Sequence, residues 1–376
     1  SYGMGMWWEG ANRVNRKHYF VEWEQFFKFE RIRARTTMAT QITIKDIAKI
    51  LGISVSTVSR ALKNHPDISA ETKKEVQELA KKLNYTPNAI ALSLRNKKTF
   101  LIAVIIPEII HHFFSCVISG VEEVANRNGY NVVIFQSNEQ YEREVSICQS
   151  ILNSRVDGVL VSMAKTTRKA DHFKELQQAG IPLVFFDRIC GDLDTDRVIV
   201  DDFNGAFAAV QHLISVGCRR IAHYSAPQTM QIAQKRQLGY IEALKDAKIP
   251  VDEDLIIQCD NQNDAMTVTE RLLKLEKRPD AIFAVNDMTA AGAMYAVKHM
   301  GFRVPEDVAI CGFTDGVVAP LTDPTLTTVE QHGDDMGEIA TNLLLRRIHA
   351  EEGERIPTVT KVIKTNLIIR ESTCRK

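Results

Sequence analysis

The hydrophobic positions follow two different patterns, and the pattern changes near residue 100. Between residues 42 and 85, apolar residues recur every three or four positions, as they do on amphipathic helices. The first such stripe consists of Ile44, Ile47, Ala48 and Leu51. From residue 100 onward, short runs that are apolar throughout alternate with amphipathic stretches. The chain therefore predicts a small all-α region followed by a larger α/β region.

Three short helices are predicted in the first region, each with its own capping residue. Thr43 precedes the stretch 44–51, and Ser54 precedes residues 55–62 after a tight turn at Gly52. Ser69 opens the third helix within SAET, a sequence typical of a helix start. The side chains expected to face inward are Val58, Ala61 and Leu62 on the second helix and Val76, Leu79, Ala80 and Leu83 on the third.

The second region predicts parallel sheets covered by helices on both faces, because strands buried on both sides are apolar throughout. The predicted strands are LIAVIIP, NVVIF, VDGVLVS, IPLVFFD, RVIVDD, RIAHYS, DAIFAVND and VAICGF. Helical stretches between them include VISGVEEVANRNG, FNGAFAAVQHLISVG and TAAGAMYAVKHMG, and a glycine ends each of these. About 270 residues of this kind are too many for one comfortable sheet, so we expect two lobes.

A short connector, TPNAIALSLRNKKT at residues 86–99, joins the two regions. Thr86 suits an N-cap and Pro87 suits the first helical position. Only about two and a half turns follow, too few for a helix that stands alone in water. The connector therefore predicts a helix that needs a partner in order to be stable.

Composition narrows the class of protein. The 376 residues are 45% hydrophobic and 25% charged, as in ordinary globular proteins. The strongest apolar run, FLIAVIIP, has the length of a strand, so no membrane partner is expected, and the N-terminus lacks the pattern of a secretory signal. The seven cysteines are scattered and never spaced C-x-x-C, which is typical of reduced thiols in a cytoplasmic protein.

The formal net charge of zero hides an uneven distribution. Residues 1–37 carry 7 Lys and Arg against 4 Asp and Glu, and residues 38–98 carry 11 against 5. The rest of the chain carries 29 against 38. A basic N-terminal region on an acidic body indicates that a polyanion binds at one end, with chance variation between surfaces as the alternative.

Residues 1–39 show no clear periodicity, and order is expected to begin just after Met38. We interpret the first 37 residues as an upstream extension or leader, with Met38 as the physiological start, and expect residues 1–39 to be disordered. A functional basic and aromatic arm is the alternative.

A helix, a glycine turn and a second short helix form the pattern of a helix-turn-helix, whose second helix reads the major groove. On that helix, Arg60 matches the two acceptors of guanine. Val55 can contact a thymine methyl group, and Ser56 can bond to a base or phosphate. The alternative is a three-helix module that binds protein.

These motifs resemble the DNA-binding head and hinge of the lactose-repressor/galactose-repressor (LacI/GalR) family. The similar segments are TIKDIAKILGISVSTVSRALKN, ISAETKKEVQELAKKLNYTPNAIALSLR, RQLGYIEAL, DAIFAVNDMTAAGA, VPEDVAICGFTDG and PTLTTVEQ, and together they span residues 40–372. The resemblance implies a bacterial transcription factor that binds a palindromic operator in double-stranded DNA as a homodimer. Its body would have the two-lobed fold of type I periplasmic sugar-binding proteins.

The resemblance also implies a domain organisation: a helix-turn-helix domain at 40–85, a hinge helix and linker at 86–98, and an effector-binding and dimerisation domain at 99–372. The N-lobe would comprise about 99–199 and 332–362, and the C-lobe about 200–331 and 363–372. The hinge helix would form on operator binding, with Leu94 as a wedge between central base pairs. The residues expected to contact DNA are Thr43, Ser54, Val55, Ser56, Thr57, Ser59, Arg60, Asn64, Asn88, Ala91, Leu94 and Arg95.

Polar side chains at the carboxyl ends of predicted strands indicate a ligand cleft between the lobes. Asp187, Asp202 and Asp287 stand at such ends, although Asp202 and Asp287 could instead cap the following helices. The resemblance adds Arg236 and a pair of aromatic residues, whereas Thr314 stands where many relatives carry an acidic ligand residue. The expected effector contacts are Phe113, Phe114, Asp187, Arg236, Asn286, Asp287, Thr314 and Asp315.

The chain is thus predicted to be a transcriptional regulator, specifically a repressor, whose operator affinity depends on a small effector. A sugar or sugar derivative is favoured and a nucleobase less so, because carboxylates, amides and guanidinium groups suit hydroxyls. No cofactor is expected, and His111–His112 lack partners at zinc spacing. The alternatives are a sugar-binding receptor without DNA function and, more remotely, an enzyme.

Overall fold

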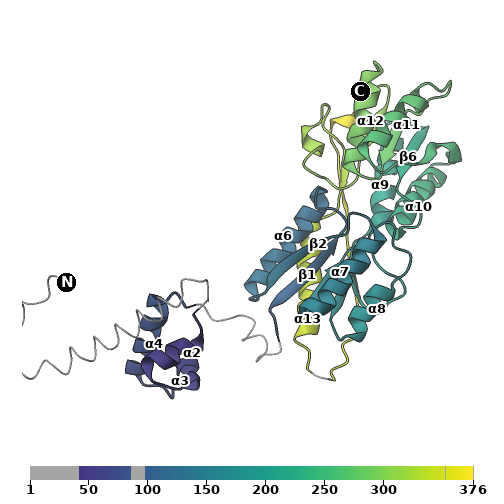
Figure 1. Cartoon of the computed structure of the whole chain (residues 1–376). Coiled ribbons are helices and arrows are strands. Elements are labelled where there is room, and N and C mark those ends of the chain that lie inside the picture. Colours follow the sequence, from purple (N-terminus) through teal and green to yellow (C-terminus); the bar gives the residue numbers. More distant parts are fainter. Residues whose placement is uncertain (1–41, 86–97, 352, 376) are drawn as a thin grey trace, which may run out of the picture. The chain divides into compact units, whose positions relative to one another are not determined.

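The computed structural model describes residues 42–85, 98–351 and 353–375 (Figure 1). The chain divides into two compact units, Ser1–Lys97 and Lys98–Lys376, which we call the head and the body. Each is described by itself.

The head contains the three predicted helices: α2 (Ile44–Leu51), α3 (Val55–Leu62) and α4 (Ala70–Lys82). Asp46 accepts hydrogen bonds from both the backbone N–H and the hydroxyl of Thr43, and Gly52 ends α2 in the left-handed conformation. The Ser54 and Ser69 hydroxyls accept hydrogen bonds from the N–H groups of Thr57 and Thr72. The core consists of Ile47, Ala48, Val58, Ala61, Val76 and Ala80, with Leu79 and Leu83 packed against it. The predicted caps and inward faces of the head are therefore confirmed.

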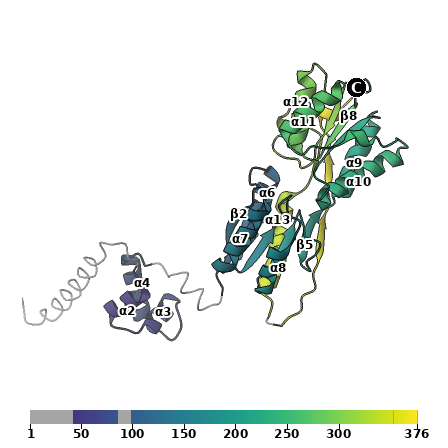
Figure 2. The same ribbon diagram turned by 45° about the vertical axis from the view of Figure 1, so that its right-hand side comes forward.

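The body's N-lobe is built on a parallel six-stranded sheet. The strand order is β11 (Thr360–Ile363), β5 (Asp196–Val200), β4 (Leu183–Phe186), β3 (Gly158–Val161), β1 (Leu101–Ile106), β2 (Asn131–Gln136). Helices α6 (His112–Arg127) and α13 (Gly333–Ile348) cover one face, and α7 (Tyr141–Ser154) and α8 (Asp171–Gln178) cover the other (Figure 2). Successive residues of β1 divide between the two cores, as a strand buried on both faces requires.

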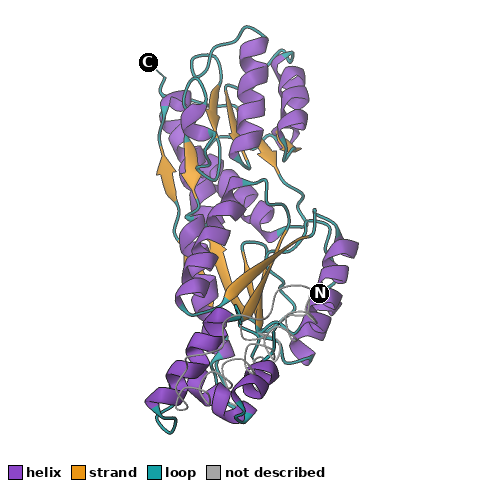
Figure 3. Ribbon diagram, turned by 60° about the vertical axis from the view of Figure 1, so that its left-hand side comes forward, coloured by secondary structure: helices purple, strands orange, loops and turns teal. Residues whose placement is uncertain are grey.

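The C-lobe repeats this layered arrangement (Figure 3). Its parallel sheet has the order β7 (Ile256–Gln258), β6 (Ile221–Ser225), β8 (Ala281–Ala284), β9 (Ala309–Cys311). Helices α9 (Asp202–Ser215) and α10 (Gln231–Asp246) pack on one face, and α11 (Gln262–Leu273) and α12 (Asp287–His299) on the other. An antiparallel pair, β10 (Thr328–Glu330) and β12 (Asn366–Ile368), and three short 3₁₀ turns, Glu253–Leu255, Ala319–Leu321 and Glu371–Thr373, complete the lobe.

The chain passes between the lobes after β5, after β10 and after β11. All eight strands predicted from sequence are present, with boundaries shifted by a few residues. The prediction missed β7, β10, β11 and β12, and it began α6 five residues too late, at Val117 instead of His112.

Candidate functional site

Helix α3 presents an exposed polar and apolar face at the surface of the head. Val55 is 41% exposed, and Ser56 and Arg60 are exposed on the same helix. The buried residues Val58 and Ala61 fix the rotation of α3 about its axis, because they pack against α2 and α4. The predicted base-reading side chains therefore point away from the core.

Other predicted DNA contacts also shape the head itself. The Ser54 hydroxyl lies 2.7 Å from the Ser56 hydroxyl and 2.9 Å from that of Thr57, so these groups share one small network at the start of α3. Asn64, in the left-handed conformation, accepts a hydrogen bond from Gln77. Thr57 and Ser59 are half-buried, and Thr43 is exposed. The remaining predicted contacts, Asn88, Ala91, Leu94 and Arg95, lie outside the described residues, as does the leader at 1–39.

In the body, Arg236 and Asp202 form a buried ion pair next to the carboxyl end of β8. The Arg236 Nε lies 2.7 Å from the Asp202 Oδ1, and the same guanidinium donates a 2.6 Å hydrogen bond to the Val285 carbonyl. The guanidinium carbon lies 3.7 Å from the ring centroid of Phe313. Burial raises the pKa of Asp202, and the charge of Arg236 opposes that rise. Arg236 is thus held rigidly, with its orientation set by three partners.

Asp187 follows β4 and lies in a second charged group, on the N-lobe. Burial raises the pKa of Asp187 to about 6; Arg188 lowers it, while Asp202 of the C-lobe raises it further. The Ser162 hydroxyl lies 3.4 Å from the Asp187 carboxylate. The charge of Arg236 also lowers the pKa of this carboxyl, so charges on both lobes act on Asp187.

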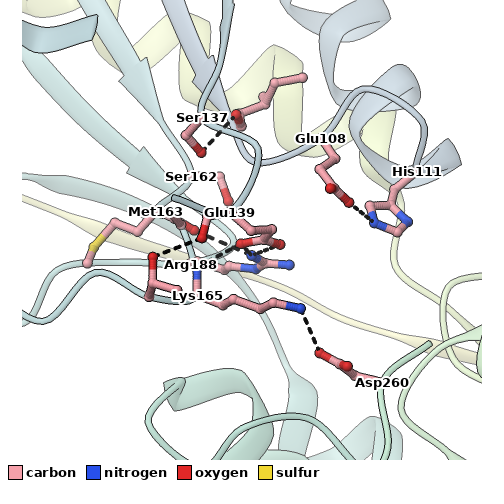
Figure 4. A network of polar contacts seen from close by, with 12 residues as sticks. Glu108, His111, Ser137, Glu139, Ser162, Met163, Lys165, Arg188 and Asp260 are labelled. Carbon is pink, nitrogen blue, oxygen red and sulfur yellow. Dashed lines mark hydrogen bonds and ion pairs between the residues drawn. The ribbon is translucent and has the colours of Figure 1, made fainter. Parts of the chain in front are cut away.

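Sequence reasoning missed Arg188 and Glu139, which complete this group. The Arg188 guanidinium donates to both carboxylate oxygens of Glu139, at 2.7 and 2.9 Å (Figure 4). Its central carbon lies 5.9 Å from the Phe114 ring centroid. Each lobe therefore presents an arginine over a phenylalanine. The sequence held a signal for Arg188, because it directly follows Asp187 at the end of a predicted strand.

A cavity of about 270 Å³ brings three of the predicted effector residues together. Phe113 lines it from α6, and Thr314 and Asp315 line it from the loop after β9. The Thr314 hydroxyl donates to Gln331 at 3.0 Å, and Asp315 pairs with Arg370 at 2.7 Å. The other lining residues are His112, Cys116, Glu330, His332, Gly333, Asp334 and Asp335. Phe114 does not line this cavity; it packs into the N-lobe core.

The structure gives the contacts of Asp287 and the identity of two helix caps. Asp287 is buried, and its carboxylate accepts hydrogen bonds from the Thr328 hydroxyl and, at 2.7 Å, from the Gly316 N–H. Each carboxylate oxygen of Asp287 thus already accepts one hydrogen bond, and these bonds support the 312–316 loop; an effector contact at Asp287 stays a prediction. The helix caps are Asp201 and Asn286, not Asp202 and Asp287.

Asn286 remains half-buried at the start of α12 with its amide engaged at both ends. Its oxygen accepts from the Thr289 N–H at 2.8 Å, and its Nδ2 donates to the Asp260 carbonyl at 3.0 Å. An effector contact at Asn286 would therefore share an atom that already has a partner.

The raised pKa of Asp187 predicts how effector affinity depends on pH. A ligand hydroxyl donates best to an ionised carboxylate, so effector affinity should rise as pH passes through the pKa of about 6 and level off about one unit above it. At pH 5 the affinity should be about tenfold weaker than at pH 7, because only about a tenth of the carboxyls are ionised. Calorimetric titration across pH 5–8 measures this. Asp187→Asn should bind more weakly with no such slope; an unchanged slope in that variant would assign it to another group.

The same shift has the opposite sign for stability in the unliganded protein. The folded state holds the Asp187 proton more tightly than the unfolded chain does, so this carboxyl's contribution to stability is lost as pH rises from about 4 to about 6.

The described residues also bear on metal binding, membrane insertion and thiol chemistry. Within 42–85, 98–351 and 353–375, no group of three or more His, Cys, Asp or Glu side chains has the geometry to hold a metal ion. No helix in those ranges combines the length and apolar character needed to cross a bilayer. All seven cysteines are free thiols, and five are buried; burial raises the pKa of Cys218 and Cys259 to about 12.

The chain matches two family models, on different parts of its length. Residues 43–88 match the model of bacterial regulatory proteins of the lacI family. Residues 210–373 match that of the periplasmic binding protein-like domain. The first match contains all of α2, α3 and α4, and the second contains most of the C-lobe.

Relatives cover nearly the whole chain. The ribose operon repressor of Halalkalibacterium halodurans is 35% identical over 332 residues, which are 88% of this chain and 97% of that protein. Catabolite control protein A of Priestia megaterium is 32% identical over 312 residues, 82% of this chain and 93% of that protein. These full-length similarities, together with the matched head, establish that the chain is a repressor-type regulator of this family rather than a body domain alone.

Solved structures agree in fold. A lac repressor dimer bound to operator and an anti-inducer matches with a TM-score of 0.78 at 24% identity, over 89% of this chain and 99% of that one. A CelR–cellobiose complex matches with a TM-score of 0.67 at 29% identity, over 88% and 100%. The chain belongs to the lacI family of bacterial regulatory proteins.

Proposed function

We propose that this protein is a transcriptional repressor that binds a palindromic operator and responds to a monosaccharide, and that it is not an enzyme. The observation that carries the DNA-binding part is the exposed face of α3, with Val55, Ser56 and Arg60, on a head whose sequence matches the model of bacterial regulatory proteins of the lacI family. Because its partner is chromosomal DNA, the protein acts in the cytoplasm.

The charged groups on both lobes support a sugar as the effector. Asp187 can accept hydrogen bonds from ligand hydroxyls. Glu139 holds the Arg188 guanidinium, and Asp202 and the Val285 carbonyl hold that of Arg236, so the remaining N–H groups of both arginines can donate from fixed positions. Phe113 supplies an apolar ring on the wall of a cavity that Thr314 and Asp315 also line, although Asp187, Arg188 and Arg236 do not. The relative with 35% identity is a ribose operon repressor, and a family member from Enterococcus faecium with bound ribose matches with a TM-score of 0.64. A pentose therefore fits both the chemistry and the relatives.

A thermal-shift series with D-ribose, D-galactose, cellobiose and hypoxanthine tests the effector class. Stabilisation by a bound ligand rises with ligand concentration relative to its dissociation constant. We expect a concentration-dependent rise in Tm with D-ribose and none with hypoxanthine. A rise with hypoxanthine alone would replace the sugar by a nucleobase.

The edge strand β2 supports the proposed homodimer. It lies at one end of the N-lobe sheet, yet Val133 and Ile134 on it are 37% and 41% exposed. Parallel sheets in isolated domains have both faces covered, and an exposed apolar edge is the usual place for pairing with another chain. A second copy of this chain covers that edge.

Leu94, which lies outside the described residues, is predicted to be the hinge residue that wedges between base pairs of the operator. An apolar wedge unstacks a base step at a cost of a few kcal/mol and makes further protein contact possible on the bent DNA. Leu94→Ala should weaken specific operator binding about tenfold or more and leave non-specific binding nearly unchanged. Gel-shift titrations on operator and scrambled duplexes measure both; equal losses on the two duplexes would refute the wedge.

The alternative function, a sugar receptor that does not bind DNA, would explain the body but not the presence of the head. An enzyme on the same scaffold lacks support in the body: the charged side chains at the cleft pair with one another, and none is a nucleophile activated by a base.

A further inference from the structure

A lysine of the N-lobe reaches an aspartate of the C-lobe across the cleft. The Lys165 Nζ lies 3.3 Å from the Asp260 Oδ2 (Figure 4). Lys165 stands in the loop after β3, and Asp260 follows β7 just before α11. Among the described residues, this is the one ion pair that joins the lobes away from the crossing strands.

A buried carboxylate holds the loop that contains Lys165 in place through hydrogen bonds. Glu144, fully buried on α7, accepts hydrogen bonds from the Ala164 N–H at 2.7 Å and the Thr167 hydroxyl at 2.6 Å. His172 of α8 completes the group, with its Nε2 3.0 Å from the same carboxylate. Two bonds within four residues fix the backbone on either side of Lys165, so little loop entropy remains to be lost when its ammonium pairs.

Lys165 and Asp260 are each hydrogen-bonded to a residue near the proposed effector site. The Lys165 N–H donates to Glu139 at 2.7 Å, and the same carboxylate holds Arg188. On the C-lobe, the Asp260 carbonyl accepts from the Asn286 Nδ2 at 3.0 Å. A ligand that shifts Arg188 or Asn286 therefore acts on the positions of both partners.

We propose that Lys165 and Asp260 form an ion-pair latch that stabilises the closed arrangement of the lobes and couples it to the effector site. This inference rests on the proposed effector function. The latch lowers the cost of bringing the lobes together, so an effector that needs both lobes binds more tightly when it is intact. The pair is partly exposed, which limits the expected effect to about two- to fivefold in affinity.

The test is a charge-swap series on the full chain, with D-ribose as the probe and calorimetry as the readout. Lys165→Asp and Asp260→Lys should each weaken binding about two- to fivefold, and the double swap should restore it. Raising NaCl from about 50 to about 500 mM should reduce the wild-type affinity toward that of the single variants, because salt screens the pair. The control is the exposed pair Lys174–Asp171 on α8, whose swap should change nothing.

A second experiment measures the distance between the lobes and needs no ligand. Spin labels on cysteines at exposed Lys169 and Thr267, with Cys116 and Cys374 replaced by serine, report the distance between the lobes. The single latch variants should lengthen or broaden this distance, and the double swap should reverse the change. If ribose fails to bind but the distances behave in this way, the latch stands and the proposed effector falls. Unchanged distances in the single variants, or a swap that restores neither distance nor affinity, would overturn the latch.

Discussion

Arg236→Ala is expected to abolish effector binding and to lower the free energy of unfolding by about 3–5 kcal/mol. The substitution leaves the Asp202 carboxylate buried without its partner, and it removes the hydrogen bond to the Val285 carbonyl. It also removes the cation from the face of Phe313. Burial already raises the pKa of Asp202, and without the opposing charge of Arg236 the pKa of this carboxyl should rise further.

A paired variant separates the structural role of Arg236 from its binding role. Arg236→Met combined with Asp202→Asn removes both charges, so most of the lost stability should return while effector binding stays absent. Lys235→Ala, an exposed neighbour on α10, is the matched control and should change neither quantity. Urea unfolding and calorimetry measure the two quantities. Effector binding that survives in the paired variant would make Arg236 a purely structural residue.

Arg60→Ala should relax base preference at one position in each half-site and weaken operator binding by about 1–3 kcal/mol. The prediction follows from the geometry of α3: Arg60 is exposed, one turn beyond Ser56, on a helix whose opposite face is buried. Removing a side chain that reads a base changes which sequences bind, and not only how tightly they bind.

Lys63→Ala provides the comparison, because Lys63 is an exposed cation at the end of the same helix. A lysine that binds a phosphate acts on every sequence alike, so its removal should weaken binding uniformly and reduce the salt dependence by about one counterion. Competition between single-base operator variants distinguishes the two patterns. A uniform loss for Arg60→Ala would place it on the DNA backbone instead of on a base.

The head could be predicted almost completely from the sequence, because its signals are local. Thr43, Gly52, Ser54 and Ser69 each fix a helix boundary through their own hydroxyl or backbone conformation, and the structure confirms all four. Strands β1 and β4 could also be predicted, because burial on both faces makes the surrounding sequence apolar throughout.

The missed elements depend on distant partners. Strands β7, β10, β11 and β12 do not lie within a run of four or more apolar residues, whereas the equally short β9 does. They therefore lack the continuous apolar pattern that identified the other strands. Their pairing is set by strands far away in sequence, as between β11 and β5.

The candidate effector site shows the same limit. The position of Asp187 at a strand end drew attention to a residue that the structure places among charged side chains, and its contact with an effector stays a prediction. The hydrogen bonds that Asp287 accepts from Thr328 and Gly316 were not predicted. The close approach of the Asp287 carboxylate to Gly312 depends on the absence of a Cβ there, a packing detail that no local pattern encodes. Ion pairs such as Arg188–Glu139 join residues 49 positions apart and appear only when the sheet is assembled.

Effector-controlled operator binding is tested most directly by selecting bound duplexes from a random double-stranded DNA library with the full chain. We expect enrichment of a palindrome with two half-sites, bound with strong salt dependence and released or tightened by D-ribose. Recovery of no enriched sequence at any salt concentration, from protein that is folded and dimeric, would contradict it.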